Sequence, residues 1–284
     1  MRTEAEMMDL ILAVARKDER VRGVILNGSR ANQNVKKDPF QDYDIVYLVT
    51  DVQSFRHDPG WIDVFGERMI LQLPDDMNSP EPEPHDGYVY LIQFMDGNRI
   101  DLTVYPKDKN GKIIQDSLSV VLLDKDGVIP MLEPASEKNY LPKPPTRKEF
   151  DDCCNEFWWV CPYVAKGLRR GEILYAKYML DQVIREELIK MLTWYIGLQT
   201  GYAVNPGKFG KYFERYLPAD LWEDLMQTFA GADYEENWKA LEAISRLFRR
   251  VALDVADGCG FTYPLRDDEL VSEFFNQIRA LDYY

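Results

Sequence analysis

The chain has 284 residues, 46% of them hydrophobic and 29% charged, with a formal net charge of −14. This length allows two domains with separate cores, and no apolar run is long enough to span a membrane. We expect neither nucleic acid nor a membrane as partner, because acidic surfaces repel polyanions and attract polycations. The alternative is that this charge serves solubility alone.

The N-terminus opens with acidic Glu4 and Glu6 and lacks the basic segment of a signal peptide, so we expect a cytoplasmic protein. We also expect a monomer. Two histidines, His57 and His85, lie in loop-like sequence, which disfavours a zinc centre or a histidine-based triad. The four cysteines form no C-x-x-C pair, so we expect reduced, mostly buried thiols.

The first half of the chain combines helix and strand patterns. Thr3 to Glu6 form a capping box, and the apolar spacing that follows predicts a helix over 4–17. Asp96-Gly97 is a hairpin turn signal between two strand-like runs. Further apolar runs predict strands at 21–27, 42–49, 68–73, 88–95, 99–105 and 118–123, with a short helix at 51–55.

Four prolines between 134 and 145 mark a change of pattern, and we place the domain boundary there, giving domains 1–137 and 138–284. The expected fold class is α+β: an N-terminal mixed-sheet domain is followed by a C-terminal all-α helical bundle. Beyond the boundary, helical periodicity and a second capping box at Thr146 predict helices at 146–166, 173–200, 208–216, 219–229, 234–256 and 267–281.

Three carboxylates lie at the start of, or within, strand-like runs. Asp42 and Asp44 point to the same side of one predicted strand, ~7 Å apart, and Asp101 lies in a later strand. Carboxylates held so close repel one another unless a cation lies between them, and Mg²⁺ favours such oxygens, usually shared with substrate phosphates. Gly28-Ser29 ends the preceding strand, where backbone N–H groups can face those phosphates.

This arrangement resembles the DNA polymerase beta-like nucleotidyltransferase superfamily. Gly28-Ser29-Arg30, Asp42-Tyr43-Asp44, Asp124-Lys125-Asp126 and the Asp-Asp-Cys-Cys-Asn-Glu-Phe-Trp block at 151–158 are similar to the aminoglycoside 6-adenylyltransferases, also called streptomycin adenylyltransferases. The resemblance covers nearly the whole chain. It implies transfer of AMP from Mg-ATP to a hydroxyl of an aminoglycoside, at position 6 of streptomycin, with release of pyrophosphate and inactivation of the antibiotic.

The resemblance also implies roles for the carboxylates. Asp42 and Asp44 are interpreted as Mg²⁺ ligands, and Asp101 as both a metal ligand and the general base that takes the proton of the attacking hydroxyl. The alternative for Asp42 and Asp44 is a pair of solvated residues at a strand start. For Asp101 it is a surface residue on an edge strand, since Arg99 and Thr103 on the same face are also polar.

Gly28 and Ser29 are interpreted as a phosphate cradle, the alternative being an ordinary strand-to-helix turn. Arg30 either contacts the triphosphate of ATP or pairs with a nearby carboxylate. Lys208 and Lys211 form a small basic cluster that suits a triphosphate, as lysines of the helical domain do in related enzymes; the alternative is a solvated helix face.

Acceptor recognition is assigned to the first helix of the second domain. Asp152 and Glu156 are four residues apart and share a face, where they could hold the cationic groups of an aminoglycoside. Alternatively, Asp151 and Asp152 only favour the helix dipole. Trp158 and Trp159 either pack against sugar rings or, as the pattern favours, belong to the core.

Two other functions stay open. One is a nucleotidyltransferase of the same superfamily that acts on another small molecule or on a protein, since the acceptor site decides the function. The other is a non-catalytic nucleotide-binding module. The usual mark of such a module is a missing carboxylate, and all three are present here.

Overall fold

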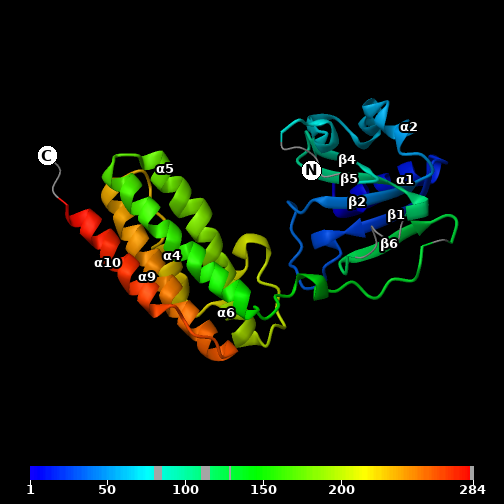
Figure 1. The fold of residues 1–284 in the computed structure, drawn as a ribbon. Helices are drawn as coiled ribbons and strands as arrows, with labels where there is room; N and C mark the ends of the chain where they lie inside the picture. Colours follow the sequence, from blue (N-terminus) through cyan, green and yellow to red (C-terminus); the bar gives the residue numbers. More distant parts are fainter. Residues whose placement is uncertain (80–84, 110–115, 128, 282–284) are drawn as a thin grey trace. The chain divides into compact units, whose positions relative to one another are not determined.

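The computed structural model describes residues 1–79, 85–109, 116–127 and 129–281. It consists of two compact units, Met1–Asn139 and Tyr140–Tyr284, called here the sheet unit and the helical unit (Figure 1). The predicted fold class is confirmed, because a mixed sheet forms the first unit and helices form the second. No helix in the described part of the chain is long and apolar enough to cross a membrane.

The sheet unit is built on one six-stranded sheet with the strand order β3-β4-β5-β2-β1-β6. β2 and β5 pair in parallel, and every other neighbouring pair is antiparallel. The strands are β1 (Val21–Asn27), β2 (Tyr43–Val49), β3 (Arg68–Gln72), β4 (Tyr88–Phe94), β5 (Arg99–Pro106) and β6 (Ser119–Asp124). The helices are α1 (Glu4–Lys17), α2 (Gln53–Arg56) and the 3-10 turns η1 (Gly28–Arg30), η2 (Pro59–Phe65), η3 (Pro74–Asp76), η4 (Lys107–Lys109) and η5 (Lys138–Tyr140).

The two faces of the sheet differ. The larger core lies on the face that α1, α2 and η2 cover, and it includes Tyr43, Ile45 and Tyr47 of β2. Alternate residues of the same strand, Val46 and Leu48, belong to a small cluster on the opposite face. Side chains alternate along a strand, so Asp44 also faces away from α1.

The predicted capping box at Thr3 is present, since its side chain accepts from the backbone of Glu6 and the Glu6 side chain accepts from the Thr3 backbone. The helical unit has the same device at Thr146 and Glu149. Its elements are α4 (Arg147–Arg169), α5 (Ile173–Tyr178), the π-helical turn η6 (Met179–Ile184), α6 (Arg185–Thr200), η7 (Lys208–Gly210), α7 (Phe213–Tyr216), α8 (Ala219–Met226), α9 (Tyr234–Cys259) and α10 (Leu265–Ala280).

The core of the helical unit forms around the middle of α4. Phe157 and Phe248 of α9 are fully buried and stack with ring centroids 3.7 Å apart. Trp158 is also buried and donates its indole N–H to Tyr263 at 3.0 Å. Trp159 is 63% exposed. The core interpretation therefore holds for Trp158 and is wrong for Trp159, because consecutive helix positions point in different directions.

The predicted single helix over 208–216 is wrong. The chain forms the 3-10 turn η7 and then the separate one-turn helix α7. The backbone explains the break, because Gly207, Phe209 and Gly210 all have positive φ angles. Phe209, with φ of 57°, is a non-glycine residue in the left-handed region, which an α-helix cannot contain.

The Phe157–Phe248 stack gives a test of the core. Phe157→Ala should lower the free energy of unfolding of the helical unit by ~3–5 kcal/mol, because it removes a buried ring and leaves a cavity. Trp159→Ala, at the exposed neighbouring position, should change it by ~0.5 kcal/mol or less. Urea unfolding followed by far-UV circular dichroism measures both; equal losses would contradict this description of the core.

Candidate active site

The three predicted carboxylates come together on the sheet face that α1 leaves free. The parallel register of β2 and β5 sets Asp44 directly opposite Asp101. Asp42 immediately precedes β2 and carries its side chain to the same side. The strand pairing therefore places Asp101 next to the strand that carries Asp44.

The electrostatics of these carboxylates reflect their crowding. Burial, followed by the charges of Asp101 and Asp42, raises the pKa of Asp44 from 3.8 to about 6. Burial also raises the pKa of Asp42, although Arg99 opposes that shift. A cation placed between these oxygens would relieve both penalties.

Gly28 has a structural task that differs from the predicted phosphate cradle. Its φ angle is +71°, and a Cβ at this position would lie 2.2 Å from Oδ2 of Asp44. Its backbone N–H donates to the carbonyl of Leu118 at 3.0 Å. Gly28 therefore leaves the space that the Asp44 carboxylate occupies. Ser29 follows it in η1, and its carbonyl accepts from the Gln41 side chain at 3.4 Å.

Arg30 lies on the buried side of this loop. Its guanidinium donates to the carbonyls of Asp42 at 3.0 Å and Gln41 at 2.6 Å. It also lies 3.5 Å from the Glu4 carboxylate and stacks over the Tyr43 ring. Of the two roles left open for Arg30, this geometry favours the carboxylate pairing, which is with Glu4. The hydrogen bonds to the two carbonyls fix the backbone that carries Asp42.

Arg99 is a site residue that sequence reasoning did not select. Its Nε and Nη2 donate to Oδ1 and Oδ2 of Asp101, both at 2.7 Å, and its Nη1 lies 3.6 Å from Oδ2 of Asp42. The i, i+2 spacing of Arg99 and Asp101 on one strand was the available signal. Among the described residues, no three histidine, cysteine or acidic side chains form a ready metal-ligand group.

The residues nevertheless fit Mg²⁺. Asp42, Asp44 and Asp101 supply the hard oxygen ligands that this ion favours. The raised pKa of Asp44 shows a partly buried, crowded carboxylate whose charge a cation would stabilise, and Gly28 leaves the space that this carboxylate occupies. These three aspartates are the residues that would hold the ion.

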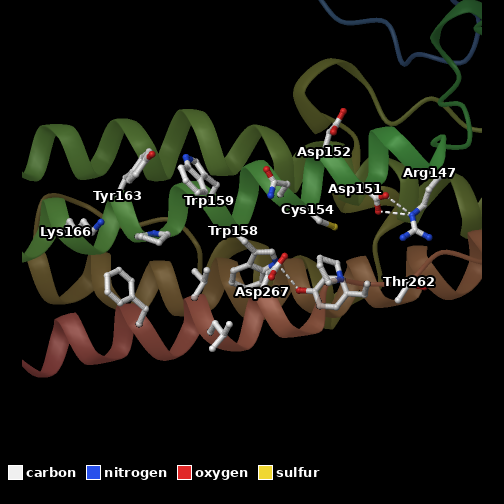
Figure 2. A pocket seen from close by; sticks show the side chains of 17 residues that line it. Arg147, Asp151, Asp152, Cys154, Trp158, Trp159, Tyr163, Lys166, Thr262 and Asp267 are labelled. Carbon is white, nitrogen blue, oxygen red and sulfur yellow. Dashed lines mark hydrogen bonds and ion pairs between the residues drawn. The ribbon is translucent and has the colours of Figure 1, made fainter.

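The helical unit contains a groove between α4 and α10, with a volume of about 1040 Å³. Trp159 and Tyr163 form an aromatic wall on α4, with ring centroids 6.5 Å apart. Asp151, Asp152 and Asp267 bring carboxylates to the lining. Figure 2 shows these side chains along the groove, with Arg147 bonded to Asp151 at one end. Such a surface suits a ligand with cationic and apolar faces.

The two predicted acceptor residues differ in position. Asp152 lines this groove and pairs with Lys148 at 2.6 Å, and its side chain is 63% exposed. Glu156 is exposed on the same helix but does not line the groove. Sequence reasoning missed Asp267, because only the packing of α10 against α4 brings it to the same surface as Asp152. It also missed Tyr163, although the helical spacing of Asp152 and Tyr163 along α4 was an available signal.

Lys208 and Lys211 are exposed in the helical unit, on and just after η7. Their ammonium groups lie over the neighbouring rings of Phe209 and Tyr212, at 5.1 and 4.9 Å. Both amines are therefore held by local contacts that a stronger anionic ligand could replace.

Comparison with known proteins decides the family. The family model described as streptomycin adenylyltransferase matches residues 1–278. The chain belongs to the streptomycin adenylyltransferase family. It is 45% identical to "Aminoglycoside 6-adenylyltransferase" of Bacillus subtilis (strain 168) over 94% of this chain and 95% of that protein. It is 41% identical to the Campylobacter jejuni protein of the same name, over 98% and 96% of the two chains.

A solved structure is similar as well. The crystal structure of an aminoglycoside 6-adenyltransferase from Bacillus subtilis covers 99% of this chain and all of that one, at 40% identity and a TM-score of 0.49. Membership of the streptomycin adenylyltransferase family makes this protein a nucleotidyltransferase. The predicted family and enzyme class are confirmed.

The Asp44→Asn substitution tests how strongly burial and the neighbouring carboxylates destabilise the ionised side chain of Asp44. Folding raises the pKa of Asp44, so its favourable contribution to stability is full below about pH 4 and is lost as the pH rises through about 6. At pH above 7 in EDTA, Asp44→Asn should therefore raise the free energy of unfolding of the sheet unit, by up to ~3 kcal/mol.

Thermal unfolding at neutral and acidic pH measures this difference between wild type and Asp44→Asn. The advantage of the mutant should disappear as the pH falls well below 3.8, where Asp44 is protonated in both the folded and the unfolded state. A mutant that is less stable than wild type at neutral pH would show that the ionised Asp44 is well solvated or well paired.

Proposed function

We propose that this protein transfers AMP from Mg-ATP to a hydroxyl group of an aminoglycoside, with position 6 of streptomycin as the acceptor, and releases pyrophosphate. The observation that carries this proposal is the register that sets Asp44 opposite Asp101 on one open sheet face. Relatives of 37–45% identity over nearly the whole chain bear the name aminoglycoside 6-adenylyltransferase, which supports the acceptor class.

In this mechanism the three carboxylates share one role, and Asp101 has a second. Asp42, Asp44 and Asp101 would hold Mg²⁺, which neutralises charge on the triphosphate and on the attacking oxygen. Asp101 lies at the end of the cluster nearest β4 and takes the proton of the acceptor hydroxyl as that oxygen attacks the α-phosphorus. The P–O bond to the β-phosphate breaks in the same step, and pyrophosphate carries away its electron pair.

Most of the rate enhancement in such a transfer comes from positioning and charge stabilisation. Arg30 contributes by fixing the backbone of Gln41 and Asp42 at the start of β2. Gly28 contributes by leaving room for Asp44. Ser29, Lys208 and Lys211 are our candidates for phosphate contacts of ATP, since each offers donors to oxygen anions.

Acceptor recognition is proposed for the acidic side chains of α4. Asp152, together with Asp151 and Asp267, lines the groove with carboxylates beside the aromatic wall of Trp159 and Tyr163. An aminoglycoside presents ammonium or guanidinium groups on sugar rings, and these pair with carboxylates and pack on aromatic faces. Glu156 stays a candidate on the adjoining exposed surface of the helix.

Pyrophosphate release from Mg-ATP tests the activity directly. We expect release with streptomycin as acceptor and not with kanamycin or spectinomycin, and a fall in kcat of ~100-fold or more in Asp101→Asn, because the general base is lost. Near-normal turnover in Asp101→Asn would remove this residue from the mechanism. Release with none of the three acceptors would overturn the aminoglycoside assignment and leave the nucleotidyltransferase assignment intact.

Asp152→Asn tests the acceptor groove. This change should raise KM for the aminoglycoside by about fivefold, because it removes one exposed ion pair that contributes ~1 kcal/mol to binding. KM for ATP should stay unchanged. Glu223→Gln, an exposed acid on α8 outside the groove, is the matched control. Equal effects of the two substitutions on KM would show only a general charge effect.

A further inference from the structure

The carboxylate cluster already has a cationic partner in the protein itself. The Arg99 guanidinium binds both oxygens of Asp101, at 2.7 Å each, in a bidentate pair. Its third nitrogen, Nη1, lies 3.6 Å from Oδ2 of Asp42. Bidentate pairs of arginine with carboxylate are the strongest of the common charge-assisted contacts.

The topology places Arg99 and the three carboxylates on the same face of the sheet. Arg99 and Asp101 are two residues apart on β5, so their side chains leave the sheet on the same face. β2 lies beside β5 and brings Asp42 and Asp44 to that face. The guanidinium is therefore a positive group beside these three carboxylates, and it is still 39% exposed to solvent.

The oxygens that Arg99 holds are those that a divalent ion would need. Both oxygens of Asp101 accept from the guanidinium, so an ion that uses Asp101 and Asp42 as ligands competes with Arg99 for them. Free Mg²⁺ offers the displaced guanidinium no new partner. Mg-ATP does, because arginine matches the geometry of phosphate oxygens as well as that of carboxylates.

We propose that Arg99 is a displaceable counter-ion of the catalytic carboxylates, which yields Asp101 and Asp42 to the metal and binds the triphosphate of ATP. This inference rests on the metal role given to the carboxylates in the proposed function. It makes loading of the metal depend on the nucleotide: the free ion binds weakly against Arg99, and the metal–nucleotide complex binds well because it supplies the guanidinium with phosphate oxygens.

Binding of Mn²⁺, followed by the EPR signal of the free ion, tests this proposal on the full chain without turnover. Arg99→Gln should tighten binding of free Mn²⁺ by about fivefold or more, since the competing cation is gone. The same variant should weaken binding of Mn-ATP by a comparable factor, because the phosphate partner is lost. A merely structural role for Arg99 would weaken both.

Three further variants complete the experiment. Arg68→Gln removes an arginine of similar exposure that pairs with Asp63 elsewhere on the same sheet, and it should change neither affinity. Arg99→Lys keeps the charge without the bidentate geometry and should fall between wild type and Arg99→Gln. Asp101→Asn should abolish binding, so the free-ion signal should no longer fall when protein is added, and this shows that the Mn²⁺ binds at the carboxylate cluster.

The outcomes separate this inference from the function on which it rests. If Mn-ATP binding is sensitive to Asp101→Asn but Arg99→Gln leaves free Mn²⁺ binding unchanged or weaker, the counter-ion role is overturned and the metal site stands. If neither wild type nor Arg99→Gln binds Mn²⁺ in a way that depends on Asp101, the metal role of the carboxylates is overturned with it.

Discussion

β2 and β5 run parallel with Asp44 opposite Asp101, and the chemistry of the sheet unit depends on this register. The carboxylates come from segments more than fifty residues apart, so only strand pairing brings them together. A shift of one residue would turn a carboxylate toward the core under α1. The alternating apolar residues Tyr43, Ile45 and Tyr47, all buried in that core, oppose such a shift because it would expose them.

The same register brings three negative charges together, and the surrounding residues reduce the electrostatic repulsion between them. Gly28 leaves space for the Asp44 carboxylate, and Arg99 neutralises Asp101 and lies near Asp42. The pKa of Asp44, still raised to about 6, shows that the compensation is incomplete. Such residual strain is common where a site is prepared for a ligand, and stability is given up there for function.

The helical unit supports its groove on a rigid core. Asp268 is fully buried and accepts from Arg249, Tyr263 and Ser272, so its charge is compensated. Tyr263 in turn accepts from Trp158, which lines the groove from α4. Because the hydrogen bonds of this buried network are all made, the groove above it keeps its shape when exposed side chains such as Asp152 exchange partners.

The sequence by itself determined the features that depend on local pattern. Helix and strand periodicity, the capping boxes at Thr3 and Thr146 and the Asp-x-Asp spacing all involve residues a few positions apart, and the structure contains each of them. Local pattern failed at 208–216, where positive φ angles at Gly207, Phe209 and Gly210 break the expected helix.

Only the tertiary structure decided that Arg99 holds Asp101, that Gly28 makes room for Asp44, and that α10 completes the groove. The physical reason is that these contacts depend on which strands and helices pack side by side. Packing is set by burial summed over the whole chain, and no short spacing of residues encodes it.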